Sequence, residues 1–266
     1  MLLKINHTTK YNYDEPVFYG LQQVRLTPHS QVGQVVKKWV TIIEGGFQEL
    51  EFDDHHKNRV LLASLENNQK SISVHCRGEV ETSDLGGVYG EENNSIPLWF
   101  YKRSTKLTAP GQQICELANS FSKQSNESIS MLHSLSKTIH EKVTYKTGKT
   151  KTATLAEEAL VAGHGVCQDH AHIFIAAARL MNFSARYVSG YLMMNDRVEQ
   201  NATHAWAEVY VQNIGWVGFD VSNNISPDER YVRVATGLDY KEAAPITGLR
   251  FGDSNEDMLV TLQVQQ

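Results

Sequence analysis

Hydrophobic residues alternate with polar ones up to about residue 105 of this chain and follow a helical spacing from about residue 108. The first part holds short alternating runs such as KKWVTIIE, RVLLASLE and SISVHCRGEVE, separated by turn-forming stretches such as DEP, EGGF and ENNQK. Alternation with a period of two is typical of strands that bury one face, and Gly, Asn, Asp and Pro favour the turns between them. Several short strands at this spacing predict a β sandwich or a curved sheet.

The helical spacing extends over three segments of the second part: PGQQICELANSFSK, SISMLHSLSKTIHEKV and TLAEEALVAG. Pro110 suits the first turn of the first helix, and a capping box of Thr154 and Glu157 is expected to open the third, which ends at Gly163. The apolar positions that define one face of the first two helices are Ile114, Leu117 and Phe121, then Ile129, Leu132, Leu135 and Ile139.

A fourth helical segment, VCQDHAHIFIAAARLMN, carries a broad apolar stripe and is expected to be mostly buried. The strand pattern then returns in ARYVSGYLMM, THAWAEVYV, GWVGFDVS and RYVRVATG. We therefore predict an α+β protein with two domains. Residues 1–107 form an all-β, sandwich-like domain, and residues 108–266 form a core of helices packed on an antiparallel sheet, with C-terminal strands.

The composition of the chain indicates which binding partners and which cellular compartment to expect. The 266 residues are 41% hydrophobic and 21% charged, with a net charge of -5, so we expect no nucleic-acid or membrane partner. No apolar stretch approaches membrane-spanning length, and the N-terminus turns polar too early for a signal peptide. Three widely spaced cysteines argue against a disulfide framework, which fits a reducing, cytoplasmic location. The oligomeric state is not predicted.

One of these cysteines, Cys167, stands in the segment GHGVCQDHAH at the start of the fourth predicted helix. Gly163 and Gly165 allow a tight turn into that helix, which leaves the thiol accessible at its first turn. Unpaired N–H groups and the positive end of the helix dipole favour a thiolate there. The N–H of Cys167 is also placed to face a developing oxyanion. Cys167 is therefore the candidate nucleophile, and Asp169 is expected to cap the helix locally.

A nucleophilic cysteine needs a base, and the base needs a group that orients it. His204 opens the strand HAWAEVYV and Asp220 closes the strand GWVGFD, with the hairpin turn QNIG between them. Antiparallel pairing brings the two residues within about three positions of facing each other. In that register Asp220 is expected to hold the Nδ1–H of His204 while the other ring nitrogen points at the thiol. The pattern predicts a catalytic triad of Cys167, His204 and Asp220.

The segments GHGVCQDHAHIFIAAARLMNFSARYVSGYL and THAWAEVYVQNIGWVGFDVSNN closely resemble the bacterial transglutaminase-like cysteine-protease family. The runs HTTKYNYDEPV, QQVRLTPHS and FDDHHKNRV resemble the β domain that precedes this core in bacterial members, and VRVATGLDYKEAAPITGLRFG resembles their C-terminal segment. The resemblance covers nearly the whole chain. It implies a papain-like, transglutaminase-like core and a papain-like mechanism carried by the same three residues.

The chain departs from the family pattern at a few positions near these blocks. A proline and a threonine usually follow the aspartate, where this chain has Val221 and Ser222. A phenylalanine is usual at the position of His170, and an arginine is frequent at the position of Leu238. None of these positions belongs to the triad, but His170 and Leu238 are expected to affect the cleft and hence the substrate.

His164, Cys167, His170 and His172 allow a different interpretation, a metal site. A helix places residue 172 on the other side from residue 167, and zinc prefers a closed four-ligand set, so no metal is predicted. Trp206 and His172 are instead expected to line the cleft and bind substrate, with core packing as the alternative for both. A third interpretation makes Cys167 a buried structural cysteine.

The residues therefore predict a thiol acyl-transfer enzyme that works without a cofactor through an acyl-enzyme. Water is the expected acceptor, which makes the enzyme a hydrolase of peptide or amide bonds in a peptide or protein substrate, because nothing in the sequence identifies an amine-binding site. Two alternatives stay open: a transglutaminase that cross-links protein glutamine residues, and a binding module that keeps the fold without turnover.

Overall fold

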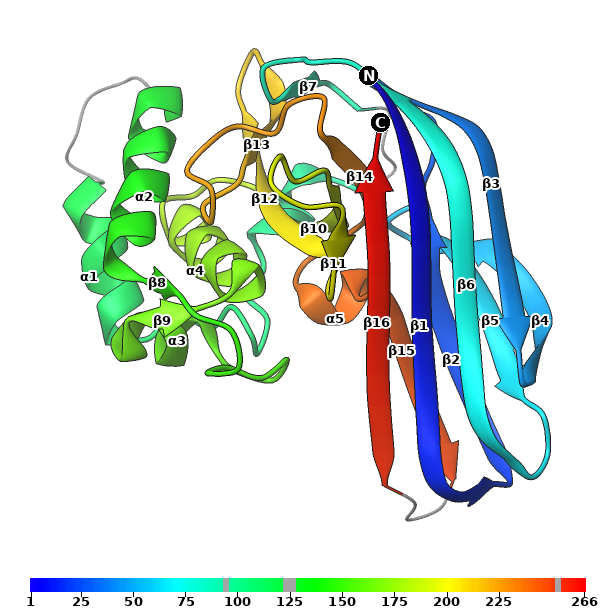
Figure 1. Cartoon of the computed structure of the whole chain (residues 1–266). Coiled ribbons are helices and arrows are strands. Elements are labelled where there is room, and N and C mark those ends of the chain that lie inside the picture. The colour runs from blue at the N-terminus through cyan, green and yellow to red at the C-terminus, as the bar shows by residue number, and fades with distance from the viewer. Residues whose placement is uncertain (93–95, 122–127, 252–254) are drawn as a thin grey trace.

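The computed structural model describes residues 1–92, 96–121, 128–251 and 255–266. Its α+β architecture has an all-β part at one end and a helical part at the other, with a central sheet between them (Figure 1). The all-β part contains two sheets, with strand orders β11-β16-β1-β6-β3 and β15-β2-β5-β4. Their strands are β1 (Leu2–Val17), β2 (Tyr19–Thr27), β3 (Gln34–Glu44), β4 (Gly46–Asp53), β5 (Arg59–Leu65), β6 (Gln69–Thr82), β11 (Glu199–Gln200), β15 (Ile246–Phe251) and β16 (Glu256–Gln265).

Side chains alternate between buried and exposed along β1, as the sequence pattern predicts for a strand with one face in a core. Leu3 and Ile5 of β1 pack in a cluster with Val24 of β2, Leu61 of β5 and Val74 of β6. This cluster joins strands of both sheets, so the all-β part is a sandwich. The predicted fold class, an α+β core preceded by an all-β sandwich-like region, is confirmed.

The C-terminal strands lie in the sandwich rather than in the core that precedes them. β16 pairs with β1 in the register Ile5↔Val264, and β15 pairs with β2 in the register Val24↔Ile246. The predicted division at residue 107 placed these strands with residues 108–266. The structure differs because their inward side chains, such as Leu262, complete the hydrophobic cluster of the sandwich.

The central sheet has the strand order β14-β10-β12-β13-β7 and carries the helices on one side (Figure 1). Its strands are β7 (Val88–Gly90), β10 (Ala185–Leu192), β12 (His204–Val211), β13 (Gly215–Phe219) and β14 (Tyr231–Gly237). The helices are the 3-10 helix η1 (Leu98–Lys102), α1 (Gln112–Phe121), α2 (Ser128–Lys142), α3 (Ala156–Ala162), α4 (Cys167–Leu180) and α5 (Tyr240–Ala243). A short parallel pair, β8 (Thr144–Tyr145) and β9 (His164–Gly165), precedes α4.

Helix α4 lies at the centre of the second part, and its residues 168–179 are all buried. One cluster joins α4 to the helices around it and to the sheet beneath it, through residues such as Leu117, Leu135, Phe174 and Val209. The predicted faces of α1 and α2 are the buried ones. The broad apolar stripe predicted for α4 is therefore enclosed on all sides, which fixes the position of its first residue.

The capping of α3 differs from the sequence prediction by one residue. The helix ends at Gly163, whose φ of 67° is left-handed, as predicted. At its start, Glu158 rather than Glu157 accepts the backbone N–H of Leu155 at 2.9 Å. Glu157 reaches the neighbouring helix α1 and accepts N–H groups of Gly111 and Gln113 at 3.1 and 2.7 Å.

The sandwich and the central sheet share one hydrophobic cluster. Tyr191 of β10 and Val232 and Val234 of β14 pack with the sandwich residues Leu3 and Leu262. No helix within the described ranges combines the length and the apolar character needed to cross a membrane.

Candidate active site

Cys167 is the first residue of α4, and the two glycines before it have separate structural roles. Gly163 takes the left-handed conformation that ends α3. A Cβ at Gly165 would lie 2.6 Å from the Cβ of Asp169, so only glycine allows this approach. Asp169 accepts the N–H of Val166 at 2.8 Å and the hydroxyl of Thr150 at 2.7 Å, which is the local capping that the sequence predicts.

His204 and Asp220 lie next to each other at the ends of β12 and β13. The register Ala207↔Phe219 places Asp220 opposite Trp206, two residues from His204. The distance between Nε2 of His204 and Oδ2 of Asp220 is 2.6 Å, and both residues are buried. The sequence pattern predicts the Nδ1–H at this contact. The ring is turned the other way, because strand register fixes the position of a histidine but not the rotation of its ring.

Cys167 lies near His204, and its thiol is one of the groups that raise the pKa of this imidazole. Since Nε2 faces Asp220, the ring nitrogen left for the thiol is Nδ1. Burial lowers the pKa of His204, but the charge of Asp220, its hydrogen bond and the contact with Cys167 together raise that pKa to about 10. The structure thus brings the three predicted residues together in the order thiol, imidazole, carboxylate, with the imidazole favoured in its protonated form.

Asp220 is held by more groups than His204 alone. Burial would raise the pKa of its carboxyl, but hydrogen bonds from His204, Tyr231 and Asn223 lower that pKa. The hydroxyl of Tyr231 donates to Oδ2 at 2.6 Å, and Nδ2 of Asn223 donates to the same oxygen at 2.7 Å. Neither of these two partners is predicted by the sequence pattern. Asn223, three residues after Asp220, fits the local Asx-type turn signal, whereas Tyr231 comes from β14.

Tyr145 is a further residue at the thiol that the sequence analysis did not identify. The parallel pairing of β8 with β9 places it opposite Gly165, two residues before Cys167. Its side chain is half exposed, and burial together with the nearby thiol raises the pKa of its hydroxyl to about 12. Tyr145 therefore lies at the open side of the site as a neutral hydroxyl.

The two residues predicted to bind substrate are both buried in the structure. Trp206 is 1% exposed and stacks beside His204, with ring centroids 6.3 Å apart and an angle of 27° between the rings. His172 is 0% exposed and its Nε2 accepts the backbone N–H of Tyr240 at 3.1 Å. Their surroundings support packing roles, which the sequence analysis gave as the alternative: Trp206 supports the imidazole and His172 supports α5.

The histidines near Cys167 do not converge on a metal position. Nδ1 of His170 lies 2.9 Å from the Ser222 hydroxyl, and Nε2 lies 2.9 Å from the Val143 carbonyl oxygen. Nδ1 of His164 lies 2.9 Å from the carbonyl oxygen of Ala162. Both ring nitrogens of His170 are thus engaged in hydrogen bonds.

Of the four departures from the family pattern, His170 and Ser222 contact each other, while Val221 and Leu238 pack in hydrophobic clusters. His170 and Ser222 are hydrogen-bonded to each other, so these two departures from the family pattern form a single contact. Leu238 is buried in a cluster with Tyr101 and Trp216.

Two family models match separate regions of the chain, one in the N-terminal β part and one in the helical core. The model of the transglutaminase-like superfamily matches residues 116–221, and that of the bacterial transglutaminase-like N-terminal region matches residues 3–81. An uncharacterized protein of Mycobacterium leprae is 25% identical over 283 residues, covering 98% of each chain. An uncharacterized protein of Mycobacterium tuberculosis is 37% identical over 141 residues, which are 49% of this chain and 45% of that protein.

A crystal structure from Cytophaga hutchinsonii, provisionally described as a cysteine protease, has the same fold. Its TM-score is 0.77 at 21% sequence identity, and the match covers 100% of this chain and 91% of that one. The superposition thus includes both the sandwich and the helical core. By these two matches, residues 116–221 belong to the transglutaminase-like superfamily and residues 3–81 to the bacterial transglutaminase-like N-terminal region.

Proposed function

We propose that this protein is a thiol acyl-transfer enzyme that hydrolyses peptide or amide bonds through an acyl-enzyme on Cys167. One observation carries the proposal: Nε2 of the buried His204 lies 2.6 Å from the buried carboxylate of Asp220, which leaves the other ring nitrogen for the nearby thiol of Cys167 at the start of α4. This is the arrangement that activates a nucleophile and later supplies a proton to the leaving group.

In the proposed reaction, the thiolate of Cys167 attacks the carbonyl carbon of the substrate, and the carbonyl oxygen becomes an oxyanion. The backbone N–H of Cys167 lies in the first turn of α4, where amides have no carbonyl partner within the helix, so it can donate to that oxyanion. The imidazolium of His204 gives its proton to the leaving amine. The product of this half-reaction is a thioester on Cys167.

In the second half-reaction, neutral His204 takes a proton from a water molecule that attacks the thioester, and the thiolate leaves as the carboxylic acid forms. Asp220 keeps its charge throughout, because its hydrogen bonds hold its pKa low. We assign water as the acceptor, since Cys167 is only partly buried and water can reach it. Neither half-reaction requires a metal ion or an organic cofactor.

We also propose a peptide or protein as the substrate and the reducing cytoplasm as the location. The three cysteines are all free thiols, and Cys76 is buried within the sandwich, where it has no cysteine near it to pair with. This arrangement supports a compartment that keeps thiols reduced.

The test is turnover of a fluorogenic peptide library by the wild-type protein beside Cys167→Ala and Cys167→Ser. We expect hydrolysis by the wild type only, with unchanged circular dichroism of both variants. Adding a fluorescent primary amine then separates water from amine as the acceptor. Turnover by Cys167→Ala at the wild-type rate would refute the proposed nucleophile, and amine incorporation exceeding hydrolysis would refute the assignment of water.

A further inference from the structure

A second group of potential metal ligands lies away from Cys167, where the sandwich meets α5. Donor atoms of His55, His56 and Glu242 all lie within 4.8 Å of one another. The two histidines belong to the turn between β4 and β5, and Glu242 belongs to α5, so residues far apart in the sequence supply the group.

The turn that carries the histidines is organised by its first residue, Asp54. Its Oδ1 accepts the backbone N–H groups of His56 and Asn58, each at 2.9 Å, and its Oδ2 accepts the side-chain amide of Asn58 at 3.0 Å. Lys57 takes a left-handed conformation with φ of 63°, which closes the turn. The backbone on which the two imidazoles stand is therefore fixed by hydrogen bonds that do not involve the imidazoles.

Glu242 is also held in place, by contacts with residues shortly before it in the chain. Its Oε2 accepts the backbone N–H of Leu238 at 2.7 Å, and a Cβ at Gly237 would lie 2.5 Å from the Cβ of Glu242, so glycine permits this close approach. The carboxylate is thus oriented toward the turn.

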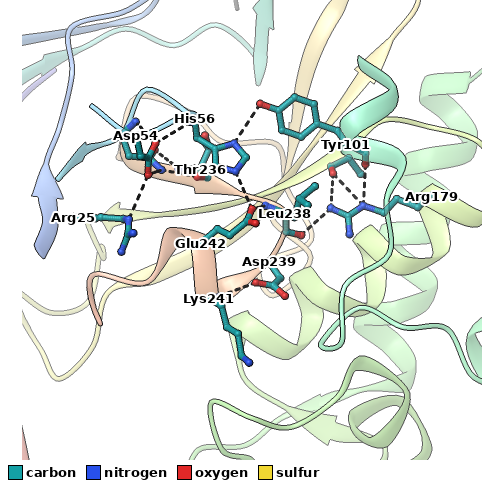
Figure 2. Close-up of polar contacts among 12 residues, drawn as sticks. Arg25, Asp54, His56, Tyr101, Arg179, Thr236, Leu238, Asp239, Lys241 and Glu242 are labelled. Carbon is teal, nitrogen blue, oxygen red and sulfur yellow. Dashed lines mark hydrogen bonds and ion pairs between the residues drawn. The ribbon is translucent and has the colours of Figure 1, made fainter. Parts of the chain in front are cut away.

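His56 lies between two groups, as Figure 2 shows. Its Nε2 is 2.8 Å from Oε2 of Glu242, and its Nδ1 is 3.5 Å from the hydroxyl of the buried Tyr101. A histidine that binds a metal through one nitrogen usually donates from the other nitrogen to a partner that fixes its tautomer. Tyr101 is placed to be that partner when Nε2 binds a metal.

A hydrogen bond joins His56 and Glu242, whereas His55 takes its position beside them through ring contacts, with His56 and edge-on with Phe100, whose ring centroid is 6.0 Å away. The ring centroids of His55 and His56 are 4.1 Å apart, although the His55 side chain is exposed and has room to turn into solvent. Two imidazoles and a carboxylate converging within ligand distance suit zinc, which binds nitrogen and carboxylate oxygen and completes its tetrahedron with water.

We propose that His55, His56 and Glu242 form a Zn²⁺ site that clamps the 54–58 turn of the sandwich onto α5. The ion displaces the proton between His56 and Glu242 and binds Nε2 of His56, one nitrogen of His55 and the carboxylate. Its role is structural and separate from the chemistry at Cys167. The proposal of this metal site therefore does not depend on the proposed function.

The experiment is a titration of chelator-treated, full-length protein with Zn²⁺, followed by calorimetry and by the thermal midpoint Tm. We expect one equivalent to bind and Tm to rise by about 5 °C at a hundredfold excess over Kd. His55→Ala and Glu242→Gln should each weaken binding by about tenfold or more. His55 is exposed, and glutamine still accepts the Leu238 N–H, so both variants should fold.

The matched control is His75→Ala, because His75 pairs with Glu44 at 3.2 Å, and the cluster of three ligands does not include either residue. This variant should bind Zn²⁺ as the wild type does. Co²⁺ substitution identifies the ligands, since thiolate binding gives a charge-transfer band that a His–His–Glu site lacks. Absence of binding, unchanged affinity in both site variants, or a thiolate band would each overturn the proposal.

Discussion

At the scale of single residues, the protonation of His204 is the property on which the proposed chemistry depends. Pairing with Asp220 and the thiol raises its pKa to about 10, compared with about 6.5 for an unperturbed histidine. Because the folded-state pKa is raised, the pairing stabilises the fold fully below about pH 6.5, and this contribution is lost as the pH rises through 10. The imidazolium needed to protonate a leaving amine should therefore persist across the neutral range.

Replacing Asp220 with asparagine should lower kcat more than it raises KM. Asparagine keeps the size of the side chain but removes the charge that stabilises the imidazolium. We expect a loss of about ten- to a thousandfold in kcat, or about 1.4–4 kcal/mol, since a cysteine depends less on its base than a serine does. The alkaline limb of the pH–kcat profile should also move to lower pH.

The comparison variant for Asp220→Asn is His204→Ala, measured on the same substrate. If Asp220→Asn has the kcat and the pH profile of the wild type while His204→Ala is inactive, the catalytic residues are a dyad of Cys167 and His204. Such a result would contradict the orienting role of the carboxylate.

At the scale of helices and strands, Glu157 links the start of α1 to α3. Its carboxylate accepts three backbone N–H groups, from Gly111, Gln113 and Ile114, at 3.1, 2.7 and 3.0 Å. These are first-turn amides that the helix itself leaves without partners. A partly exposed carboxylate that caps a neighbouring helix stabilises both elements together.

Glu157→Ala should lower the free energy of unfolding by about 1–2 kcal/mol. Three backbone amides lose a charged acceptor, and hydrogen bonds from these amides to water offset part of that loss. Glu158→Ala is the control, since Glu158 caps only the N–H of Leu155 and should cost about half as much. Urea denaturation of the two variants measures the difference. Equal losses would show that the contact with α1 adds no stability.

Sequence patterns predicted the elements that carry the site, but not the contacts between distant elements. The glycines before Cys167 and the hairpin of His204 and Asp220 are local signals, and the structure places these residues as expected along the chain. Tyr231 and Tyr145 reach the site from β14 and β8, whose neighbours depend on the topology of the whole core. The ring orientation of His204 was wrong for a related reason, because register does not determine a side-chain rotation.

At the scale of the whole molecule, the sandwich and the core are joined by strands and by a shared cluster. β16 returns to pair with β1, and Tyr191 and Val232 of the central sheet pack among the sandwich residues. Local alternation indicates a strand near the C-terminus but cannot identify the sheet that it joins, which is why the predicted division at residue 107 placed β15 and β16 with the core.

The shared cluster predicts a single cooperative unfolding transition. Trp39 reports on the sandwich, whereas Trp206 and Trp216 report on the core. In urea, the fluorescence of a variant that keeps only Trp39 should change at the same midpoint as the far-ultraviolet circular dichroism of the wild type. Midpoints that separate by more than the shift caused by the substitutions themselves would indicate two independently folding domains.

The central claim is that Cys167, activated by His204, carries an acyl group. The most direct measurement is intact-protein and peptide mass spectrometry after brief exposure to p-nitrophenyl acetate near pH 7. We predict one acetyl group on Cys167, formed at least about a hundredfold faster than on Cys115 or on the buried Cys76, whose pKa burial raises to about 11. His204→Ala should slow acetylation of Cys167 markedly. Equal labelling of the three thiols, or a rate that His204→Ala leaves unchanged, would contradict the account.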